Sequence, residues 1–316
     1  MAEILGLVLP FFGVIFLGYA IARFRKLPLD ALGWMNFFII YVALPCLFFQ
    51  LLSKTPIEKL TEWRFIAASM IATYTVFGLV FMVAYFRGSR EFSEPTIQGL
   101  AAAYGNIGYM APGIALLAFG ESAAVPLALI FCFENLMHFI VAPLFMALSG
   151  TDKRPPLVVA RDVAAKILLH PFIIATIIGV AAAALNWQPP QAVNSMVEIL
   201  ARAAAPCALF AMGVTLAMRP LKGVPIELSY IVPMKLVAHP LMCYLMMQTM
   251  GDFDPVWVAT AVLLASLPTA TNVFVLAQQY NVWVERASAT ILVSTMISVI
   301  TVTGVLYAIK SGVLPL

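Results

Sequence analysis

Long apolar stretches separated by short polar loops dominate the chain. Seven ranges contain no Asp, Glu, Lys or Arg: 4–22, 31–53, 65–86, 95–120, 167–197, 255–284 and 287–309. An α-helix needs roughly 20 apolar residues to cross the hydrocarbon core of a bilayer, and each range is close to that length or longer. The pattern therefore predicts an all-α, polytopic membrane protein.

Apolar runs combined with loop signals predict ten transmembrane helices. Their approximate ranges are 4–22, 31–52, 64–86, 96–119, 123–148, 167–187, 192–217, 227–250, 256–279 and 286–309. The longest connection is the loop 149–166, which divides the chain into residues 1–150 and 151–316. We expect five helices from each part.

Composition narrows the function classes. The 316 residues are 63% hydrophobic and 10% charged, against roughly 25% charged residues in soluble proteins. The basic residues form no stripe, so a nucleic-acid partner is excluded. The four cysteines lie in apolar runs without CxxC spacing, so neither a metal site nor a disulfide framework is expected. No phosphate loop, nucleophile elbow or HExxH motif occurs, and we predict no catalytic residues, no cofactor and no enzyme.

The distribution of basic residues predicts the orientation of the chain. The loops on one side of the membrane would hold only Lys54, Lys59, Arg64 and Lys310. The loops on the opposite side are richer in Lys and Arg. Because cytoplasmic loops are enriched in basic residues, both termini should face outward from the cell membrane. The residues assigned to the cytoplasmic side are Arg23, Arg25, Lys26, Arg87, Arg90, Lys153, Arg154, Arg161, Lys166, Arg219, Lys222 and Arg286.

Residues of the first half recur at a displacement of 161 positions in the second. The matched pairs are Pro10 and Pro171, Pro28 and Pro189, Pro45 and Pro206, Gly18 and Gly179, Cys46 and Cys207, and Phe49 and Phe210. The recurrence favours duplicated halves of the kind that transporters use. Since five is an odd number of helices, the second half would be inverted in the membrane.

The fourth and ninth predicted helices contain polar and helix-breaking residues at mid-span. These are "YGNIGYMAPG" (104–113) and "SLPTATNVF" (266–274). Unpaired backbone groups survive in a membrane only beside protein or a water-filled cavity, so two broken helices indicate a substrate site. Half-helix amino termini would face an anion there, although tight helix packing is the alternative interpretation. The candidate substrate-binding residues are Asn106, Gly108, Tyr109, Pro112, Pro268, Thr269, Thr271 and Asn272, together with Asn135 of the fifth predicted helix.

Three further pairs of ionisable residues lie inside predicted spans, where each group is costly unless paired or hydrated. Glu134 and His138 lie four residues apart on one face, with Asn135 beside them, and could relay a proton or neutralise each other. Glu198 and Arg202 could form a salt bridge, or Arg202 could attract an anion. Lys235 and His239 share a face and need an acidic neighbour or an anionic ligand, for which Glu134 and Glu198 are both candidates.

The chain resembles the auxin efflux carrier family, which includes plant PIN auxin transporters and bacterial members described as malonate transporters. The segments that carry the resemblance are "LPFFGVIFLGYAIARFRKL", "NFFIIYVALPCLFF", "YGNIGYMAPG" and "FVLAQQYNVWVERASATILVSTMISV". The resemblance implies ten helices in two inverted five-helix repeats, with helices 4 and 9 crossing beside an anionic substrate. By position it implies roles for Asn106 with Pro112 and for Asn272 with Pro268.

The resemblance also implies how the helices divide and move. Helices 1, 2, 6 and 7 would form a scaffold, and helices 3–5 and 8–10 a transport domain that slides like an elevator, in a homodimer. Plant members carry ionisable residues in helix 3, where this chain has only Ser69, Thr73, Tyr74 and Thr75. We therefore assign ion coupling, with protons as the candidate ion, to Glu134 and His138.

The first hypothesis is a secondary transporter of a small organic anion, malonate or an auxin-like carboxylate. One alternative is a sodium-coupled symporter of the bile-acid type, which the lack of carboxylates in the crossing segments disfavours. The other is a receptor with the carrier fold that binds a ligand without moving it. Membrane lipid surrounds the protein in each case.

Overall fold

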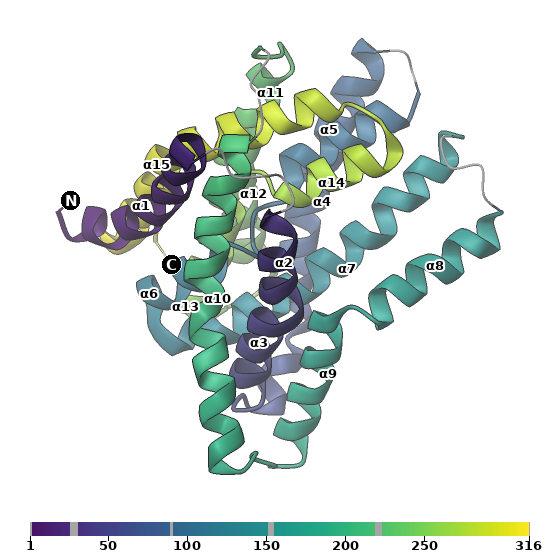
Figure 1. Cartoon of the computed structure of the whole chain (residues 1–316). Coiled ribbons are helices and arrows are strands. Elements are labelled where there is room, and N and C mark those ends of the chain that lie inside the picture. The colour runs from purple at the N-terminus through teal and green to yellow at the C-terminus, as the bar shows by residue number, and fades with distance from the viewer. Residues whose placement is uncertain (1, 26–30, 89–90, 151–154, 219–222, 316) are drawn as a thin grey trace.

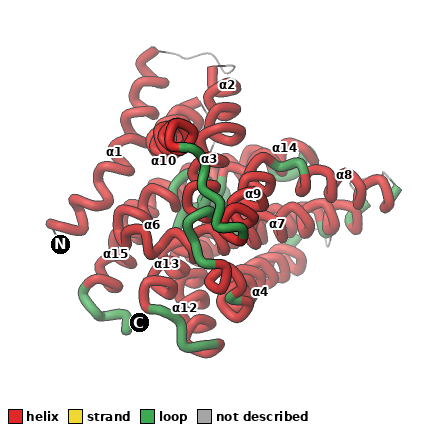
Figure 2. Tube along the Cα trace, turned by 90° about the horizontal axis from the view of Figure 1, so that it is seen from below, coloured by secondary structure: helices red, strands yellow, loops and turns green. Residues whose placement is uncertain are grey.

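Helices account for all the regular structure of the described chain. The computed structural model describes residues 2–25, 31–88, 91–150, 155–218 and 223–315. Within these ranges there is no strand beyond one isolated antiparallel bridge, and Figure 2 shows helices joined by short loops. Several residues used above lie outside the described ranges, namely Lys26, Pro28, Arg90, Lys153, Arg154, Arg219 and Lys222.

The predicted spans of the first half fall on helices or on interrupted pairs of helices. Two pairs are interrupted, one by a π-helical turn at Ile39–Ala43 and one by an irregular stretch at 104–110. Short 3₁₀ turns cover Ile57–Thr61 and Gly120–Ala123. The helices are α1 (Ala2–Arg25), α2 (Ala31–Phe38), α3 (Leu44–Leu52), α4 (Trp63–Arg87), α5 (Ser93–Ala103), α6 (Ala111–Phe119) and α7 (Ala124–Leu148).

The second half shows the same kind of interruptions. A π-helical turn, Met234–Ala238, joins α11 to α12, and residues 267–270 separate α13 from α14. The helices are α8 (Pro156–Leu168), α9 (Pro171–Ala184), α10 (Gln191–Met218), α11 (Leu228–Pro233), α12 (His239–Met250), α13 (Pro255–Ser266), α14 (Thr271–Tyr280) and α15 (Val284–Lys310).

The central connection was predicted as a loop, and this prediction is wrong for most of its length. Helix α8 begins at Pro156, two residues past the undescribed stretch, and ends at Leu168 (Figure 1). Proline is favoured in the first turn of a helix, and the following residues alternate apolar and charged groups at helical spacing. The search for charge-free stretches missed this helix because Arg161 and Asp162 interrupt the apolar pattern.

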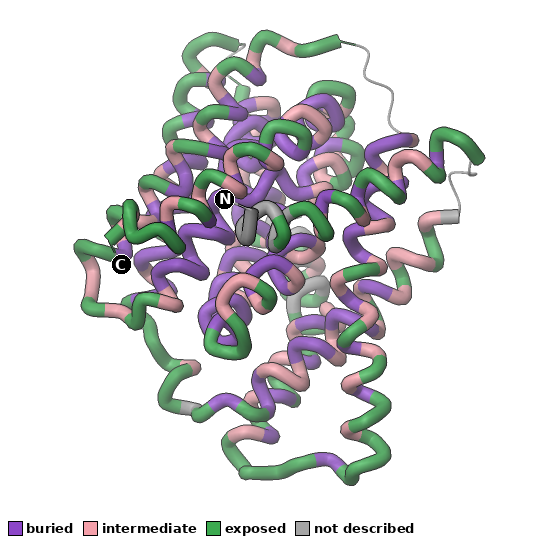
Figure 3. The backbone as a smooth tube through the Cα atoms, turned by 90° about the vertical axis from the view of Figure 1, so that its left-hand side faces the viewer, coloured by how far each residue is buried: buried purple, intermediate pink, exposed green. Residues whose placement is uncertain are grey.

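Six helical stretches of the described residues are long and apolar enough to cross a membrane. They are Leu32–Leu52, Trp63–Arg87, Ala111–Leu148, Gln191–Met218, Leu228–Met250 and Val284–Lys310. Large apolar side chains such as Phe16, Leu79 and Ile300 are exposed on the outer faces of helices, and Figure 3 shows the buried residues running through the interior. Exposed apolar surface on this scale suits lipid rather than water. A ten-helix count remains a prediction.

The helices pack in two groups. Helices α1, α2, α3, α9 and α10 contact one another, with α1 against α10 and α3 against α9 as extensive pairs. Helices α4, α5, α7 and α11–α15 form the other group, in which α4 contacts both α5 and α12. Figure 1 shows α10 beside α2 and α3, with α4 and α5 on the far side of the molecule.

Two close contacts within the first group are related by the displacement of 161 residues. A Cβ on Gly18 of α1 would lie 2.3 Å from the carbonyl oxygen of Phe210 on α10. A Cβ on Gly179 of α9 would lie 3.4 Å from the Cα of Phe49 on α3. Gly18 corresponds to Gly179, and Phe49 to Phe210, so one contact maps onto the other. Small residues here let helix backbones approach closely, as in other membrane helix pairs.

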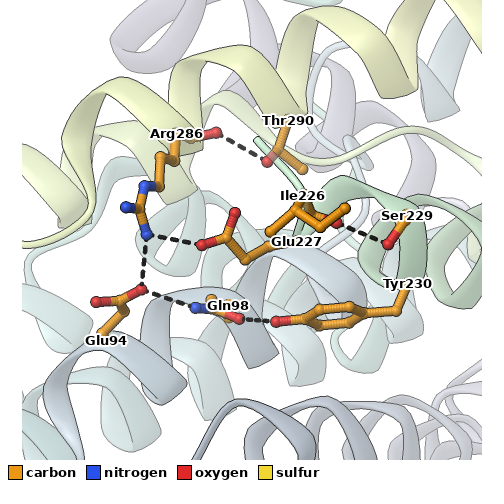
Figure 4. A network of polar contacts seen from close by, with 8 residues as sticks. All are labelled: Glu94, Gln98, Ile226, Glu227, Ser229, Tyr230, Arg286 and Thr290. Carbon is orange, nitrogen blue, oxygen red and sulfur yellow. Dashed lines mark hydrogen bonds and ion pairs between the residues drawn. The ribbon is translucent and has the colours of Figure 1, made fainter. Parts of the chain in front are cut away.

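A polar network at one end of the second group joins three helices (Figure 4). Arg286, in the first turn of α15, binds the carboxylates of Glu94 on α5 at 3.2 Å and Glu227 before α11 at 2.7 Å. Gln98 donates to Glu94 at 3.0 Å and accepts from the hydroxyl of Tyr230. Because Arg286 was predicted to be cytoplasmic, the network would close the cytoplasmic end of this group.

The α1–α10 contact predicts the effect of one small substitution. In Gly213→Ala the new Cβ would lie 1.9 Å from the carbonyl oxygen of Ile15, so the helices must separate, at a cost of roughly 1–3 kcal/mol. We expect a lower apparent Tm of the detergent-purified protein. Gly78→Ala on α4 is the control, since nothing lies within 4 Å of its Cβ. Equal Tm values for both variants would contradict the close packing of α1 on α10.

Candidate functional site

The two interrupted helices cross at their breaks. Gly105 and Thr269 form the isolated antiparallel bridge. On either side of it, the amide of Asn106 donates to the carbonyl of Pro268 at 2.8 Å, and the amide of Ala270 donates to the carbonyl of Tyr104 at 2.9 Å. The breaks predicted from the glycine, asparagine and proline content therefore occur, and each segment supplies backbone partners for the other.

Side chains satisfy the carboxyl ends of the two half-helices at the crossing. The hydroxyl of Thr269 donates to the carbonyl of Ala101, near the end of α5, at 2.7 Å. The ammonium of Lys235 donates to the carbonyl of Ala265, near the end of α13, at 2.8 Å. A buried unpaired carbonyl is costly in a membrane, so Thr269 and Lys235 stabilise the break itself.

A cavity of about 230 Å³ lies beside the crossing, between the two groups of helices. The lining includes no Lys, Arg, Asp or Glu, and its polar groups are amides, phenols and one imidazole. One flank of α14 lines the cavity, beginning with Asn272 in its first turn, so the positive dipole end of this helix lies near a bound anion. The lining residues are Ile40, Leu44, Gly108, Tyr109, Phe131, Asn135, Phe139, Pro143, His170, Phe172, Ile173, Asn272, Val275, Leu276, Gln279 and Tyr280.

The cavity collects some of the residues predicted to bind substrate and omits others. Gly108, Tyr109, Asn135 and Asn272 line it. Asn106, Pro112, Pro268, Thr269 and Thr271 do not. Of these, Thr269 is already bonded, since its amide donates to the hydroxyl of Ser294 at 3.2 Å and its hydroxyl to the carbonyl of Ala101.

The two asparagines of the crossing are not equivalent in the structure. The side-chain amide of Asn106 donates to the sulfur of Met212 on α10 at 3.1 Å, whereas that of Asn272 donates to the hydroxyl of Tyr104 at 2.7 Å. Tyr104 in turn donates to the side-chain oxygen of Asn135 on α7. The phenol thus connects both crossing segments to α7 at the cavity wall.

A second set of buried polar side chains connects α4, α7 and α12. The hydroxyl of Thr73 on α4 donates to Oε1 of Glu134 at 2.8 Å and contacts Nε2 of His239 at 3.1 Å. Nδ1 of His239 lies 2.8 Å from Nζ of Lys235. Each of the four side chains is at most 4% exposed. The structure thus brings Lys235 and His239 to Glu134 rather than to Glu198, a choice that the sequence left open.

Glu134 and His138 share a face of α7 but bind different partners. Glu134 accepts from Ser69 at 3.1 Å as well as from Thr73, while Nδ1 of His138 lies 3.0 Å from the hydroxyl of Tyr74. The His138 ring stacks on Tyr104 with centroids 4.0 Å apart, and its Nε2 has no hydrogen-bond partner among the described residues. The proposed direct exchange of a proton between Glu134 and His138 therefore has no hydrogen bond to follow here.

Glu198 and Arg202 are separate from this cluster. Arg202 binds Glu198 one turn away on α10, and the side chains are 77% and 39% exposed, respectively. The salt-bridge interpretation describes this geometry, and a role for Arg202 in holding an anion at the crossing does not fit it.

Several residues of the site were missed by sequence reasoning. Ser69 and Thr73 were noted only as replacements for ionisable residues, although their spacing of four places both hydroxyls on one face of α4. Gln279 of α14 lines the cavity, as does Val275 one turn earlier on the same helix. His170 precedes α9, accepts from the amide of Phe172 at 3.4 Å and faces the cavity, and its position before Pro171 was the available signal.

Comparison with known proteins agrees with this architecture. The model of a family described as "Membrane transport protein" matches residues 3–306. A Rhizobium meliloti (strain 1021) protein named "Putative malonate transporter" is 61% identical over 315 residues, covering 100% of this chain and 98% of that protein.

More distant relatives match over most of this chain as well. The Escherichia coli (strain K12) "Uncharacterized transporter YfdV" is 23% identical over 94% of this chain and 95% of its own length. The mouse "Lysosomal cholesterol signaling protein" is 23% identical over 91% of this chain and 35% of its own length. The expectations of a transporter rather than an enzyme, and of the auxin efflux carrier family, are confirmed: the chain belongs to the membrane transport protein family, the family of the auxin efflux carriers.

Proposed function

We propose that the protein is a secondary transporter that moves malonate, or a similarly short carboxylate, across the cell membrane. The observation that carries the proposal is the cavity beside the crossing, because it combines Asn135, Asn272 and the amino terminus of α14 in one wall. Amide donors and helix amino termini bind carboxylates. The 61% identical relative is named for malonate, and a volume of about 230 Å³ suits a short acid.

The position of the cavity supports an elevator mechanism with inverted repeats. Ile40, Leu44 and Phe172 come from the group containing α1 and α10, while Asn135 and Asn272 come from the other group. A sliding movement of the second group, as a transport domain, would carry half of the site across a scaffold formed by the first. The related contacts Gly18–Phe210 and Gly179–Phe49 support duplicated halves, residues 1–150 and 151–316.

The polar interior favours a transporter that does not use sodium. Half-helix carboxyl ends are the groups that coordinate Na⁺ in many secondary transporters. Here the ammonium of Lys235 already donates to the carbonyl of Ala265 at such an end. A tethered cation would compete with Na⁺ for that oxygen, so the sodium-coupled alternative is less well supported.

The substrate is tested by counterflow in proteoliposomes. Vesicles loaded with unlabelled malonate should accumulate labelled malonate equally well in sodium and in potassium buffer. Saturable binding without exchange would favour the receptor alternative. Accumulation that requires sodium would favour the symporter of the bile-acid type.

The cavity wall is tested by paired substitutions on α14. Asn272→Asp keeps the shape of the side chain but replaces a donor by a negative charge, so malonate exchange should fall by about tenfold or more, as expected for loss of a charge-assisted contact. Gln278→Ala is the control because that side chain is exposed and absent from the cavity wall. Normal exchange by Asn272→Asp, measured at equal amounts of folded protein, would place the substrate elsewhere.

Relative movement of the two helix groups is tested with a native cysteine. Sγ of Cys132 on α7 lies 3.5 Å from Oγ1 of Thr176 on α9, so Thr176→Cys should form a disulfide with Cys132 on oxidation. Oxidation should stop malonate exchange and reduction should restore it. The same substitution combined with Cys132→Ser should be insensitive to oxidant. Continued exchange by fully cross-linked protein would exclude sliding of α7 along α9.

A further inference from the structure

The chain Lys235–His239–Thr73–Glu134 joins a basic and an acidic side chain through two neutral ones. The four residues come from the π-helical turn before α12, from α12, α4 and α7. Two charges in the membrane interior would attract each other, yet no direct contact between Lys235 and Glu134 is made in the described structure. The bridging residues hold them apart at fixed positions.

When Lys235 and Glu134 are both charged, every hydrogen bond between them must be donated in the direction from Lys235 to Glu134. A lysine ammonium only donates, so Nδ1 of His239 must accept from it and Nε2 must carry the ring proton. Nε2 then donates to Thr73, whose hydroxyl donates to Glu134. The bonds therefore require a neutral His239, and they connect Lys235 to the carboxylate without a gap.

Lys235 is also next to the crossing. A Cβ on Gly105 would lie 3.2 Å from the Lys235 ammonium, so the absence of a side chain at Gly105 is what admits it. Glu134 immediately precedes Asn135, which lines the cavity. Lys235 thus lies beside the crossing and Glu134 lies on α7, and the crossing and α7 both contribute to the candidate substrate site.

We propose that this chain couples anion transport to a proton that binds Glu134. Without substrate, Glu134 is ionised and compensates Lys235. When a proton adds to the carboxylate, an O–H bond forms at Glu134 and its negative charge disappears. The charge of Lys235, which is buried beside the crossing and does not line the cavity, is then left to be compensated by a substrate carboxylate in the cavity. Proton and anion therefore bind together, and one proton on Glu134 balances one singly charged anion, hydrogenmalonate for this substrate. The proposal rests on the proposed function and adds its coupling ion and coupling residue.

Charge compensation explains why the coupling would be strict. A charge left alone in the membrane interior is strongly disfavoured, whereas a compensated set of charges can move. The empty transporter, with Lys235 and Glu134 both charged, is compensated. The loaded transporter, with Glu134 protonated, is compensated when the bound anion carries a single charge, as hydrogenmalonate does. A protonated transporter without an anion is not, so protons should not leak.

The other polar and titratable groups around Glu134 do not replace it in this role. Ser69 and Thr73 face it from α4, His239 and Cys243 lie on α12, and Tyr104 lies at the crossing. His138 on α7 and Tyr74 on α4 are bonded to each other. Of this set only Glu134 is a carboxyl group, and it is the acceptor at which the donors from Lys235 end.

The test compares Glu134→Gln with wild-type protein in proteoliposomes, with labelled malonate and an internal pH dye. Wild-type protein should move protons with malonate. Glu134→Gln imitates a permanently protonated site, so malonate counterflow should persist and lose its pH dependence. Net uptake should fall by about tenfold or more, because the empty transporter would return with an uncompensated Lys235.

A second pair of variants separates coupling from structural damage. Thr73→Val removes the bridging hydroxyl and should reduce proton movement per malonate. Thr260→Val removes an equally buried hydroxyl, which donates only to the carbonyl of Val256 in its own helix, and should behave as wild type. Proton movement by Glu134→Gln equal to wild type, or net malonate uptake by wild type without proton movement, would overturn the coupling proposal. Absence of malonate counterflow in wild type would instead overturn the proposed function.

Discussion

The structure depends on satisfying backbone groups where two helices break inside a membrane. Lipid offers no hydrogen-bond partners, so the amides and carbonyls at 104–110 and 267–270 must find them within the protein. Three kinds of partner supply them: the opposite crossing segment, the hydroxyl of Thr269 and the ammonium of Lys235. The crossing can therefore form only with these residues in place, and it leaves a polar surface that a substrate can use.

The use of a lysine as one of these partners has consequences for the surrounding helices. A buried ammonium is tolerated only near a compensating charge, and Glu134 on α7 provides it through Thr73 and His239. This explains why polar residues occur at mid-span on α4, α7 and α12, helices that do not themselves break at the crossing. The π-helical turn that carries Lys235 precedes Pro240, which lacks an amide and cannot close a regular turn.

Sequence reasoning located the parts of the site but not their pairing. Glycine, asparagine and proline at mid-span were sufficient to predict both breaks, and the scarcity of charge inside spans singled out Glu134, Lys235 and His239. A spacing of four residues shows that two side chains share a face, but it does not show which helix packs against that face. Thr73 is 61 positions from Glu134, and Arg202 lies on an exposed side of α10. Contacts of this kind are determined by tertiary packing.

The unequal environments of Asn106 and Asn272 bear on how the transporter changes state. Perfectly symmetric inverted repeats would surround both asparagines alike, yet Asn106 contacts Met212 of α10, whereas Asn272 contacts Tyr104 and lines the cavity. In the proposed elevator mechanism, two inverted repeats would exchange their conformations when the transporter moves. The two asparagines should therefore have different surroundings when the transporter opens to one side of the membrane. In the opposite state Asn106 would face the cavity, and Asn272 would approach Leu51, the residue 161 positions before Met212.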